Sequence, residues 1–123
     1  MKTRGFTLIE LLVVMTIIAL LLALALPRYF NHLESSRETI LRQDLAVMRD
    51  AIDKYHADTG RYPGSIEALV DARYLRALPV DPITERSDTW QILAPPDAVA
   101  GEVYDIKSGA PGPSRDGSAY ADW

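Results

Sequence analysis

An apolar run near the start of the chain constrains the fold more than any other feature. Residues 6–26 read FTLIELLVVMTIIALLLALAL. These are about 21 residues that would rise about 31 Å as an α-helix, close to the roughly 30 Å hydrocarbon core of a bilayer. Lys2 and Arg4 precede the run, and the positive-inside bias then keeps the N-terminus cytoplasmic. The sequence predicts one membrane-spanning helix, with the residues after Pro27 forming an extracytoplasmic head.

Glu10 is a charged residue inside this apolar run. A carboxylate at such a position costs about 2 to 3 kcal/mol, and ionisable groups within membrane segments are by default functional. An ordinary secretory signal is the alternative, because residues 23–25 (ALA) could pass as a small-x-small cleavage site. Such a signal gains nothing from a carboxylate, and its apolar centre is typically about 7 to 15 residues long. Glu10 therefore favours a retained, functional helix.

The residues around Glu10 form a recognisable motif. Residues 2–14 read KTRGFTLIELLVV, which resembles the leader and methylation motif of type IV pilins and type II secretion pseudopilins. The resemblance implies that a prepilin peptidase removes the leader, residues 1–5, by cleaving after Gly5. It also implies methylation of the new amine on Phe6 and a role for Glu10 in assembly.

Physical chemistry supports these roles. Gly5 has no side chain to keep a protease from the backbone, and cleavage there creates an amine on Phe6 with a pKa of about 8. Glu10 lies four residues further on, so it can pair with its own terminus or with that of a neighbouring subunit. Only the second pairing explains an assembly, because a slipped subunit would leave two buried charges unpaired. We predict a homopolymer whose register Glu10 sets; a capping or interfacial glutamate in an ordinary anchor is the alternative.

A helix is predicted to continue beyond the membrane. Pro27 removes one backbone donor and predicts a kink. Apolar residues then recur at helical spacing at Leu41, Leu45, Met48, Ile52 and Tyr55. Together with the apolar run, this stripe predicts one long helix over residues 6–57, stopped by Gly60. The four arginines at Arg28, Arg37, Arg42 and Arg49 are interpreted as a solvated face or as subunit contacts.

The remaining head sequence predicts short elements. Ser65 is a candidate N-cap for a short helix that carries Ile66, Leu69 and Val70. Residues 88–93 (DTWQIL) and 102–106 (EVYDI) predict two antiparallel strands against the long helix, separated by a loop that contains Asp97. Trp90 and Tyr104 are predicted to bury apolar area rather than to form a binding platform.

A second resemblance narrows the family. Residues 59–75 (TGRYPGSIEALVDARYL) and 78–82 (LPVDP) are similar to the segment after the long helix in the major, G-type pseudopilin of type II secretion. This implies an α+β pilin fold with an assembly helix over residues 6–27 and a periplasmic head over residues 28–123. It also implies an inner-membrane subunit that works with an assembly platform and minor pseudopilins in protein export. A type IV pilus subunit, or a monomeric membrane-anchored binding domain or small periplasmic enzyme, are the alternatives.

The C-terminal residues 108–123 (SGAPGPSRDGSAYADW) have the composition of a loop. G-type relatives close the corresponding loop around calcium, which implies Asp116, Asp122 and the carbonyl of Ser108 as candidate ligands. The loop departs from the acidic, glycine-rich form of that family at Pro111, Pro113 and Arg115. Either the prolines stiffen the loop and reduce its need for metal, or the site survives with other ligands. The alternative is a simple turn at residues 116–117 with a solvated carboxylate at residue 122.

Composition argues against several other functions. The chain has 123 residues, no cysteine, and 13 Lys and Arg against 17 Asp and Glu, for a net charge of -4. This predicts one modest head domain without disulfides and disfavours nucleic-acid binding. His32 and His56 have no nucleophile or metal spacing around them, and no phosphate loop, HExxH or GxSxG occurs. We therefore predict a structural protein and not an enzyme.

Overall fold

The computed structural model describes residues 4–96 and 99–123. Lys2 of the predicted leader and Asp97 of the predicted loop lie outside the described residues. The chain divides into two compact units, one ending at Glu34 and the other spanning Ser35–Trp123. We call the first unit the stem and the second the head, and describe each by itself.

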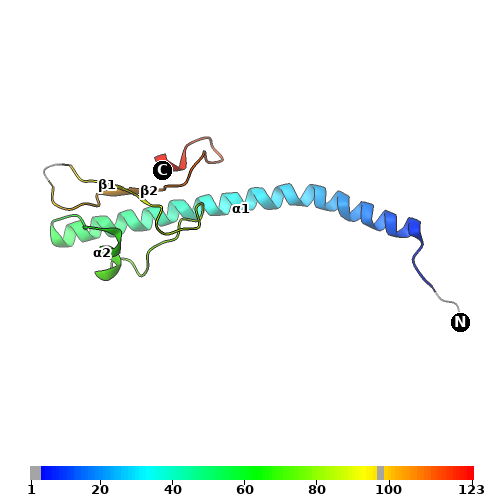
Figure 1. The fold of residues 1–123 in the computed structure, drawn as a ribbon, viewed down its shortest axis with the longest axis horizontal. Helices are drawn as coiled ribbons and strands as arrows, with labels where there is room; N and C mark the ends of the chain where they lie inside the picture. The colour runs from blue at the N-terminus through cyan, green and yellow to red at the C-terminus, as the bar shows by residue number, and fades with distance from the viewer. Residues whose placement is uncertain (1–3, 97–98) are drawn as a thin grey trace. The chain divides into compact units, whose positions relative to one another are not determined.

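One long helix, α1 (Leu8–Thr59), runs from the stem into the head (Figure 1). It begins at Leu8 because Thr7 caps it: the backbone N–H of Glu10 donates to Thr7 Oγ1 at 3.1 Å. The helix is continuous across Pro27. The predicted kink at that residue stays a prediction. The helix ends at Thr59, just before Gly60, whose φ of 76° is readily adopted by a residue without a side chain. The predicted long helix and its stop are confirmed, with bounds shifted by two residues at each end.

The core of the head forms along one stripe of α1. Leu41, Leu45, Met48 and Ile52 are each at most 1% exposed, and Tyr55 packs against them partly buried, as predicted. The stripe packs against the residues Ile66, Leu69, Leu75, Trp90, Val103 and Ile106 from the rest of the head. The apolar stripe predicted on the long helix is therefore the buried face of the head part of α1.

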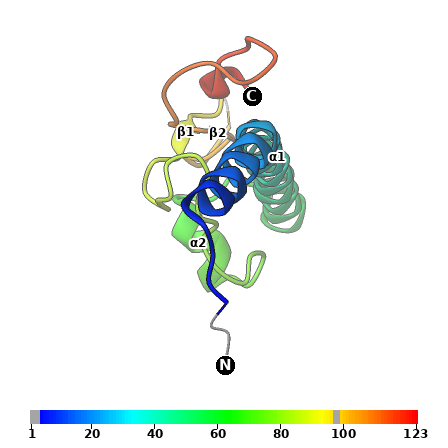
Figure 2. The same ribbon diagram turned by 90° about the vertical axis from the view of Figure 1, so that its right-hand side faces the viewer.

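The short helix α2 (Ile66–Asp71) and the strand pair lie beside the head part of α1 (Figures 1 and 2). Ser65 caps α2 as predicted, because its Oγ accepts from the backbone N–H of Ala68 at 3.2 Å. The helix contributes Ile66 and Leu69 to the core.

The two strands, β1 (Gln91–Leu93) and β2 (Asp105–Lys107), form an antiparallel pair with Ile92 opposite Ile106. Both are shorter than predicted. The backbone N–H groups of Glu102 and Val103 donate to the carbonyl of Pro63, at 3.2 and 2.9 Å, so they do not extend a ladder. β1 is exposed along its length, and only β2 places a residue, Ile106, in the core. The prediction that both strands pack on the long helix is wrong in this respect.

The two aromatic residues predicted to pack behave differently. Trp90 is 7% exposed, and its indole N–H donates to the carbonyl of Pro79 at 2.9 Å. Because the Trp90 side chain is buried in the core, β1 begins only at the next residue, Gln91. Tyr104 is 45% exposed and packs edge-on against Tyr62 at 5.1 Å between ring centroids. The predicted α+β class is confirmed by one long helix with a small antiparallel sheet.

Candidate functional site

The start of the stem places the predicted processing and assembly residues together. Gly5 precedes α1 in open chain, and a Cβ added there would meet nothing within 4 Å. Phe6 follows with its side chain 85% exposed. A surface hollow of about 470 Å³ is lined by Arg4, Gly5, Phe6 and Glu10. The peptide bond after Gly5 is therefore accessible to a protease.

Glu10 and Thr7 form a reciprocal capping box at the first turn of α1. The backbone N–H of Thr7 donates to Glu10 Oε2 at 3.3 Å, while the N–H of Glu10 donates to Thr7 Oγ1. Both donors lie beyond the predicted cleavage point after Gly5. Glu10 is exposed, and only its Oε2 takes part in these described bonds. The other carboxylate oxygen is placed to receive a further donor, such as an amine.

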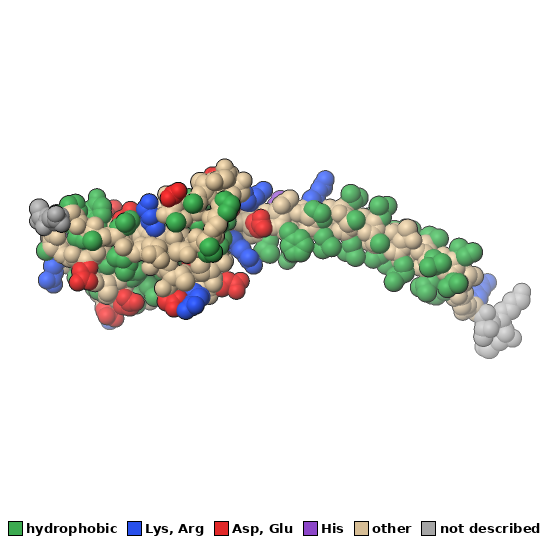
Figure 3. Space-filling view, turned by 45° about the horizontal axis from the view of Figure 1, so that its top comes forward, with side chains coloured by type: hydrophobic (Ala, Val, Ile, Leu, Met, Phe, Trp, Pro, Cys, Tyr) green, Lys and Arg blue, Asp and Glu red, His purple; other side chains and the backbone are tan. Residues whose placement is uncertain are grey.

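The stem itself presents an uncovered apolar surface. Within the described residues, α1 is the one helix long and apolar enough to cross a membrane, and none of that window is buried. Figure 3 shows hydrophobic side chains covering the face of the stem in view. The hydroxyl of Thr16 donates to the carbonyl of Leu12 at 2.7 Å, so this polar group is satisfied within the helix. Such a surface requires lipid or other helices around it.

In the head, Ser108 is bound to a residue whose importance the sequence did not reveal. Asp81, the acidic residue of the LPVDP segment, is fully buried. Its carboxylate accepts from the Ser108 hydroxyl at 2.5 Å and from the N–H groups of Ile83 and Thr84 at 2.8 and 3.4 Å. Ser108 Oγ in turn accepts from the N–H of Ala110 at 3.1 Å. Asp81 thus anchors the start of the C-terminal loop, and only the fixed spacing of its motif could have drawn attention to it.

Asp116 lies at the tip of the same loop among hydrogen-bond donors. Its Oδ1 accepts from the Ser118 hydroxyl at 2.5 Å, from the Ser118 N–H at 2.9 Å and from the hydroxyl of Ser114. The hydroxyls of Ser114 and Ser118, followed by the Ser118 N–H and the nearby charge of Arg42, hold the pKa of Asp116 well below its usual range. The turn predicted as the alternative for residues 116–117 is present, with Gly117 at a φ of 90°.

The predicted calcium ligands comprise two exposed carboxylates, Asp116 and Asp122, and the carbonyl of the buried Ser108. Asp122 lies in the short 3₁₀ helix η1 (Tyr120–Asp122) with its side chain exposed. Over residues 4–96 and 99–123, no group of three or more His, Cys, Asp or Glu side chains is arranged to hold a metal ion. Calcium at Asp116, Asp122 and Ser108 stays a prediction.

Three polar residues of α1 hold the C-terminal loop, a role that the sequence did not indicate. Glu38 Oε1 accepts from the N–H of Arg115 at 2.8 Å and from the Tyr120 hydroxyl at 3.0 Å. Arg49 pairs with Asp105 at 2.9 Å and donates to the carbonyl of Trp123 at 2.6 Å. Arg42 is the third, with its Nη2 3.6 Å from Asp116 Oδ2. The interpretation of Arg42 and Arg49 as a solvated face or subunit contacts is therefore incomplete, because both contact their own loop.

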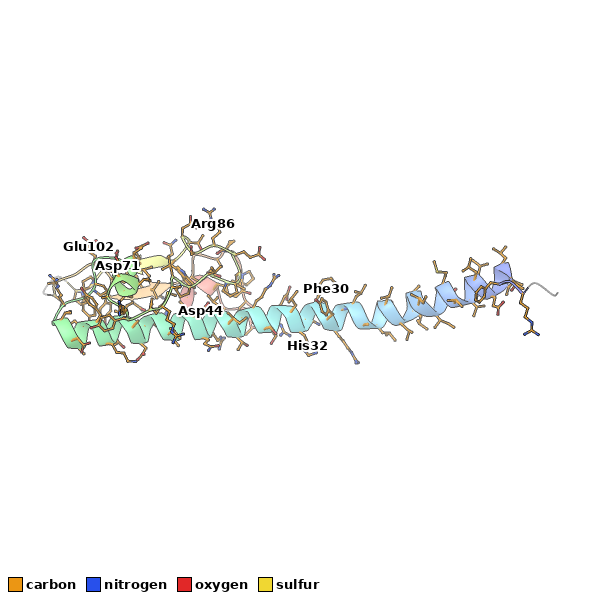
Figure 4. The ribbon with its side chains drawn as sticks, turned by 90° about the horizontal axis from the view of Figure 1, so that it is seen from below. Phe30, His32, Asp44, Asp71, Arg86 and Glu102 are labelled. Carbon is orange, nitrogen blue, oxygen red and sulfur yellow. The ribbon has the colours of Figure 1, made fainter. Side chains whose placement is uncertain are left out.

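Among the described residues, neither histidine belongs to a group of three or more side chains that could hold a metal ion. His32 is exposed on α1, close in sequence to Phe30 (Figure 4). His56 stacks on Tyr62 with ring centroids 4.2 Å apart.

Comparison with known proteins agrees with this geometry. The family described as Prokaryotic N-terminal methylation motif matches residues 1–26. The long apolar helix, the capped Glu10 and this motif define a membrane-anchored, pilin-like subunit.

Whole-chain relatives identify the family. Type II secretion system core protein G of Pseudomonas aeruginosa is 30% identical over 99% of this chain and 96% of its own length. The protein of the same name from Klebsiella pneumoniae is 32% identical over 76% of each chain. The chain belongs to the type II secretion system core protein G family. Fimbrial protein EcpC of Eikenella corrodens is also similar, at 33% identity over 63% of this chain and 54% of its own length. No solved structure matches the chain.

Proposed function

We propose that this chain is the structural subunit of a type II secretion pseudopilus, polymerising through its N-terminal helix to drive protein export across the outer membrane. One observation carries the proposal: an uncovered apolar stem whose first turn holds a carboxylate, Glu10, with an oxygen available for a second partner. In an isolated membrane anchor, Glu10 would serve only as a helix cap, and it caps through one oxygen. In a bundle of identical stems, its second oxygen can also pair with the terminal amine of a neighbour.

Processing precedes assembly in this proposal. A prepilin peptidase cleaves after Gly5, and the amine released on Phe6 is methylated. The capping box between Thr7 and Glu10 survives the cleavage, since its donors belong to residues 7 and 10. It keeps the carboxylate at the start of the helix in the unassembled subunit.

Assembly then adds an intermolecular partner. The Phe6 amine of one subunit pairs with Glu10 of its neighbour within the apolar bundle. A subunit displaced along the bundle would leave both charges unpaired in a medium of low dielectric, which penalises the wrong register. Pairing therefore selects one axial offset among many helix–helix contacts that are otherwise nonspecific.

The remaining parts of the proposal follow from the family. The subunit resides in the inner membrane with a periplasmic head, and subunits enter the rod at an inner-membrane assembly platform, with minor pseudopilins as further partners. The growing rod pushes on cargo in the periplasm. The chain acts as a structural subunit and not as an enzyme.

A type IV pilus subunit is the second candidate, because a fimbrial protein is also similar, at 33% identity over 63% of this chain. Both candidates predict the same processing and the same pairing of Glu10. They differ in the assembled filament: a pseudopilin complements secretion in a strain that lacks its own core protein G, whereas a pilin restores surface pili.

The test has two readouts on the native protein. Mass spectrometry of the mature chain is expected to find methylated Phe6 at the N-terminus. Glu10→Ala is expected to insert in the membrane at normal levels yet give few filaments in a shearing and sedimentation assay. Glu34→Ala, an exposed carboxylate on the same helix, is the matched control and should assemble normally. Normal filament yield from Glu10→Ala would refute the pairing role of Glu10. An N-terminus at Leu26 would refute polymerisation through the stem, because the stem would have been removed.

A further inference from the structure

An arginine of α1, Arg42, packs against the C-terminal loop of the head. The guanidinium carbon of Arg42 lies 4.2 Å from the centroid of the Trp123 ring. Its Nη2 lies 3.6 Å from Asp116 Oδ2. The same arginine thus contacts the last aromatic ring and the tip carboxylate of the loop, and it comes from α1, on which the loop lies.

The carboxylate of Asp116 is surrounded by donors on both oxygens. Oδ1 accepts from Ser114 and Ser118, and Oδ2 faces Arg42. Ser118 Oγ also accepts from the indole N–H of Trp123 at 2.8 Å. These bonds connect the turn, the end of the chain and the helix into one network.

The residues predicted as calcium ligands do not fit a calcium site well. Calcium takes about six to eight oxygen ligands and favours several carboxylates. The oxygens of Asp116 already face protein donors and the Arg42 guanidinium, and Asp122 is exposed in η1. The carbonyl of Ser108 would be the one predicted ligand left, far too few for calcium. A metal at Asp116 would have to displace Arg42 or turn the serine hydroxyls away.

We propose that Arg42, held between the Trp123 ring and the Asp116 carboxylate, supplies the cation that closes this loop, so that residues 108–123 dock on α1 without a bound divalent metal. Glu38 and Arg49 flank Arg42 at helical spacings of four and seven residues, and each bonds to the same segment. These three side chains on one face of α1 thereby hold the loop in place, as calcium is implied to do in the G-type relatives. This inference concerns the folded subunit alone and stands whether or not the chain polymerises.

Limited trypsin digestion of the full-length chain in detergent micelles tests the proposal. Arg115 is exposed beside Asp116, and cleavage after it requires the loop to leave α1. The measured quantity is the rate at which the peptide 116–123 is released, followed by mass spectrometry. For the wild type, this rate is expected to be the same in chelator and in millimolar calcium.

Two variants should open the loop. Arg42→Gln is expected to accelerate release by about two- to fivefold, the factor that loss of an exposed cation–π contact implies, and Arg42→Lys should fall between. Asp116→Asn removes the carboxylate charge at an exposed position and should also accelerate release, measured relative to cleavage of the free peptide 108–123 with the same substitution, because residue 116 follows the bond that trypsin cuts. Arg76→Gln, an exposed head arginine with no side-chain contact among the described residues, is the control and should leave the rate unchanged.

The outcomes distinguish closure of the loop by Arg42 from closure by calcium. If calcium slows release from the wild type and chelator speeds it, a metal closes the loop and the proposal is wrong. If Asp116→Asn leaves the rate unchanged, Asp116 is no part of the closure, and the proposal fails even where Arg42→Gln unfolds the head. Filament yield enters neither readout, so failure here is distinct from failure of the pseudopilus assignment.

Discussion

Replacing Asp81 with alanine should destabilise the head more than any other single change of a charged residue in it. The carboxylate is fully buried and accepts three hydrogen bonds, the shortest of them from the Ser108 hydroxyl at 2.5 Å. Asp81→Ala would leave the buried Ser108 hydroxyl and two part-buried backbone N–H groups without this acceptor. The anchor between the LPVDP turn and the C-terminal loop would be lost.

The magnitude follows from these bonds. Hydrogen bonds to a charged group contribute about 1.5 to 3 kcal/mol each, and a buried donor left unsatisfied costs about 1 to 3 kcal/mol. Removing the buried carboxylate also relieves its own desolvation, which offsets part of the loss. Counting the two shorter bonds fully and the third weakly, we expect a loss of about 3 to 4 kcal/mol in the free energy of unfolding. For a domain of this size, that lowers the Tm by about 12 to 25 °C.

The assay is thermal unfolding of the full chain in detergent, followed by tryptophan fluorescence, since Trp90 is buried in the core and Trp123 packs against Arg42 of α1. Asp81→Asn keeps one acceptor oxygen and should lose about half as much. Asp71→Ala, an exposed aspartate at the end of α2 (Figure 4), is the control and should barely change the Tm. A Tm for Asp81→Ala within a few degrees of that control would show that the buried network contributes little.

Two further predictions concern pH. Burial, and next the nearby charge of Asp81, raise the pKa of Asp44 above 3.8 (Figure 4 shows Asp44 on α1). Folding therefore favours the protonated carboxyl of Asp44, and its charge at neutral pH destabilises the head. Asp44→Asn should raise the Tm at pH 7 and lose this advantage below about pH 3.8. An unchanged Tm at pH 7 would contradict the repulsion between Asp44 and Asp81. The pKa of Asp116 is lowered instead, so its contribution is present above 3.8 and is lost as the pH falls below that value. The Tm difference between wild type and Asp116→Asn should accordingly be largest near neutral pH and shrink on acidification, and a difference that grows toward low pH would argue against the network around this carboxylate.

Much of the stem could be predicted from sequence because its determinants are local. Length and hydrophobicity define a membrane helix without reference to any other part of the chain. The capping residue Ser65, the stop at Gly60 and the buried stripe beginning at Leu41 are also encoded within a few residues of where they act. The structure agrees with the sequence at each of these positions.

The strands and the loop contacts were harder to predict, because they depend on partners distant in sequence. The apolar pattern of residues 88–93 favours a longer strand, but Trp90 turns into the core and donates to Pro79. Burial of one large aromatic residue outweighs the weak pairing preference of a two-stranded ladder at an exposed edge.

The sequence alone was enough to predict a membrane stem, cleavage after Gly5 and a carboxylate, Glu10, in the first turn of that stem, because spacing along one helix sets those features. The contacts that close the C-terminal loop were decided by the tertiary structure. Ser108 meets Asp81 across 27 residues, and Tyr120 meets Glu38 across 82. No periodicity relates such residues, and only the path of the folded chain brings a helix arginine to Trp123 and Asp116, where the family resemblance alone had pointed to a metal.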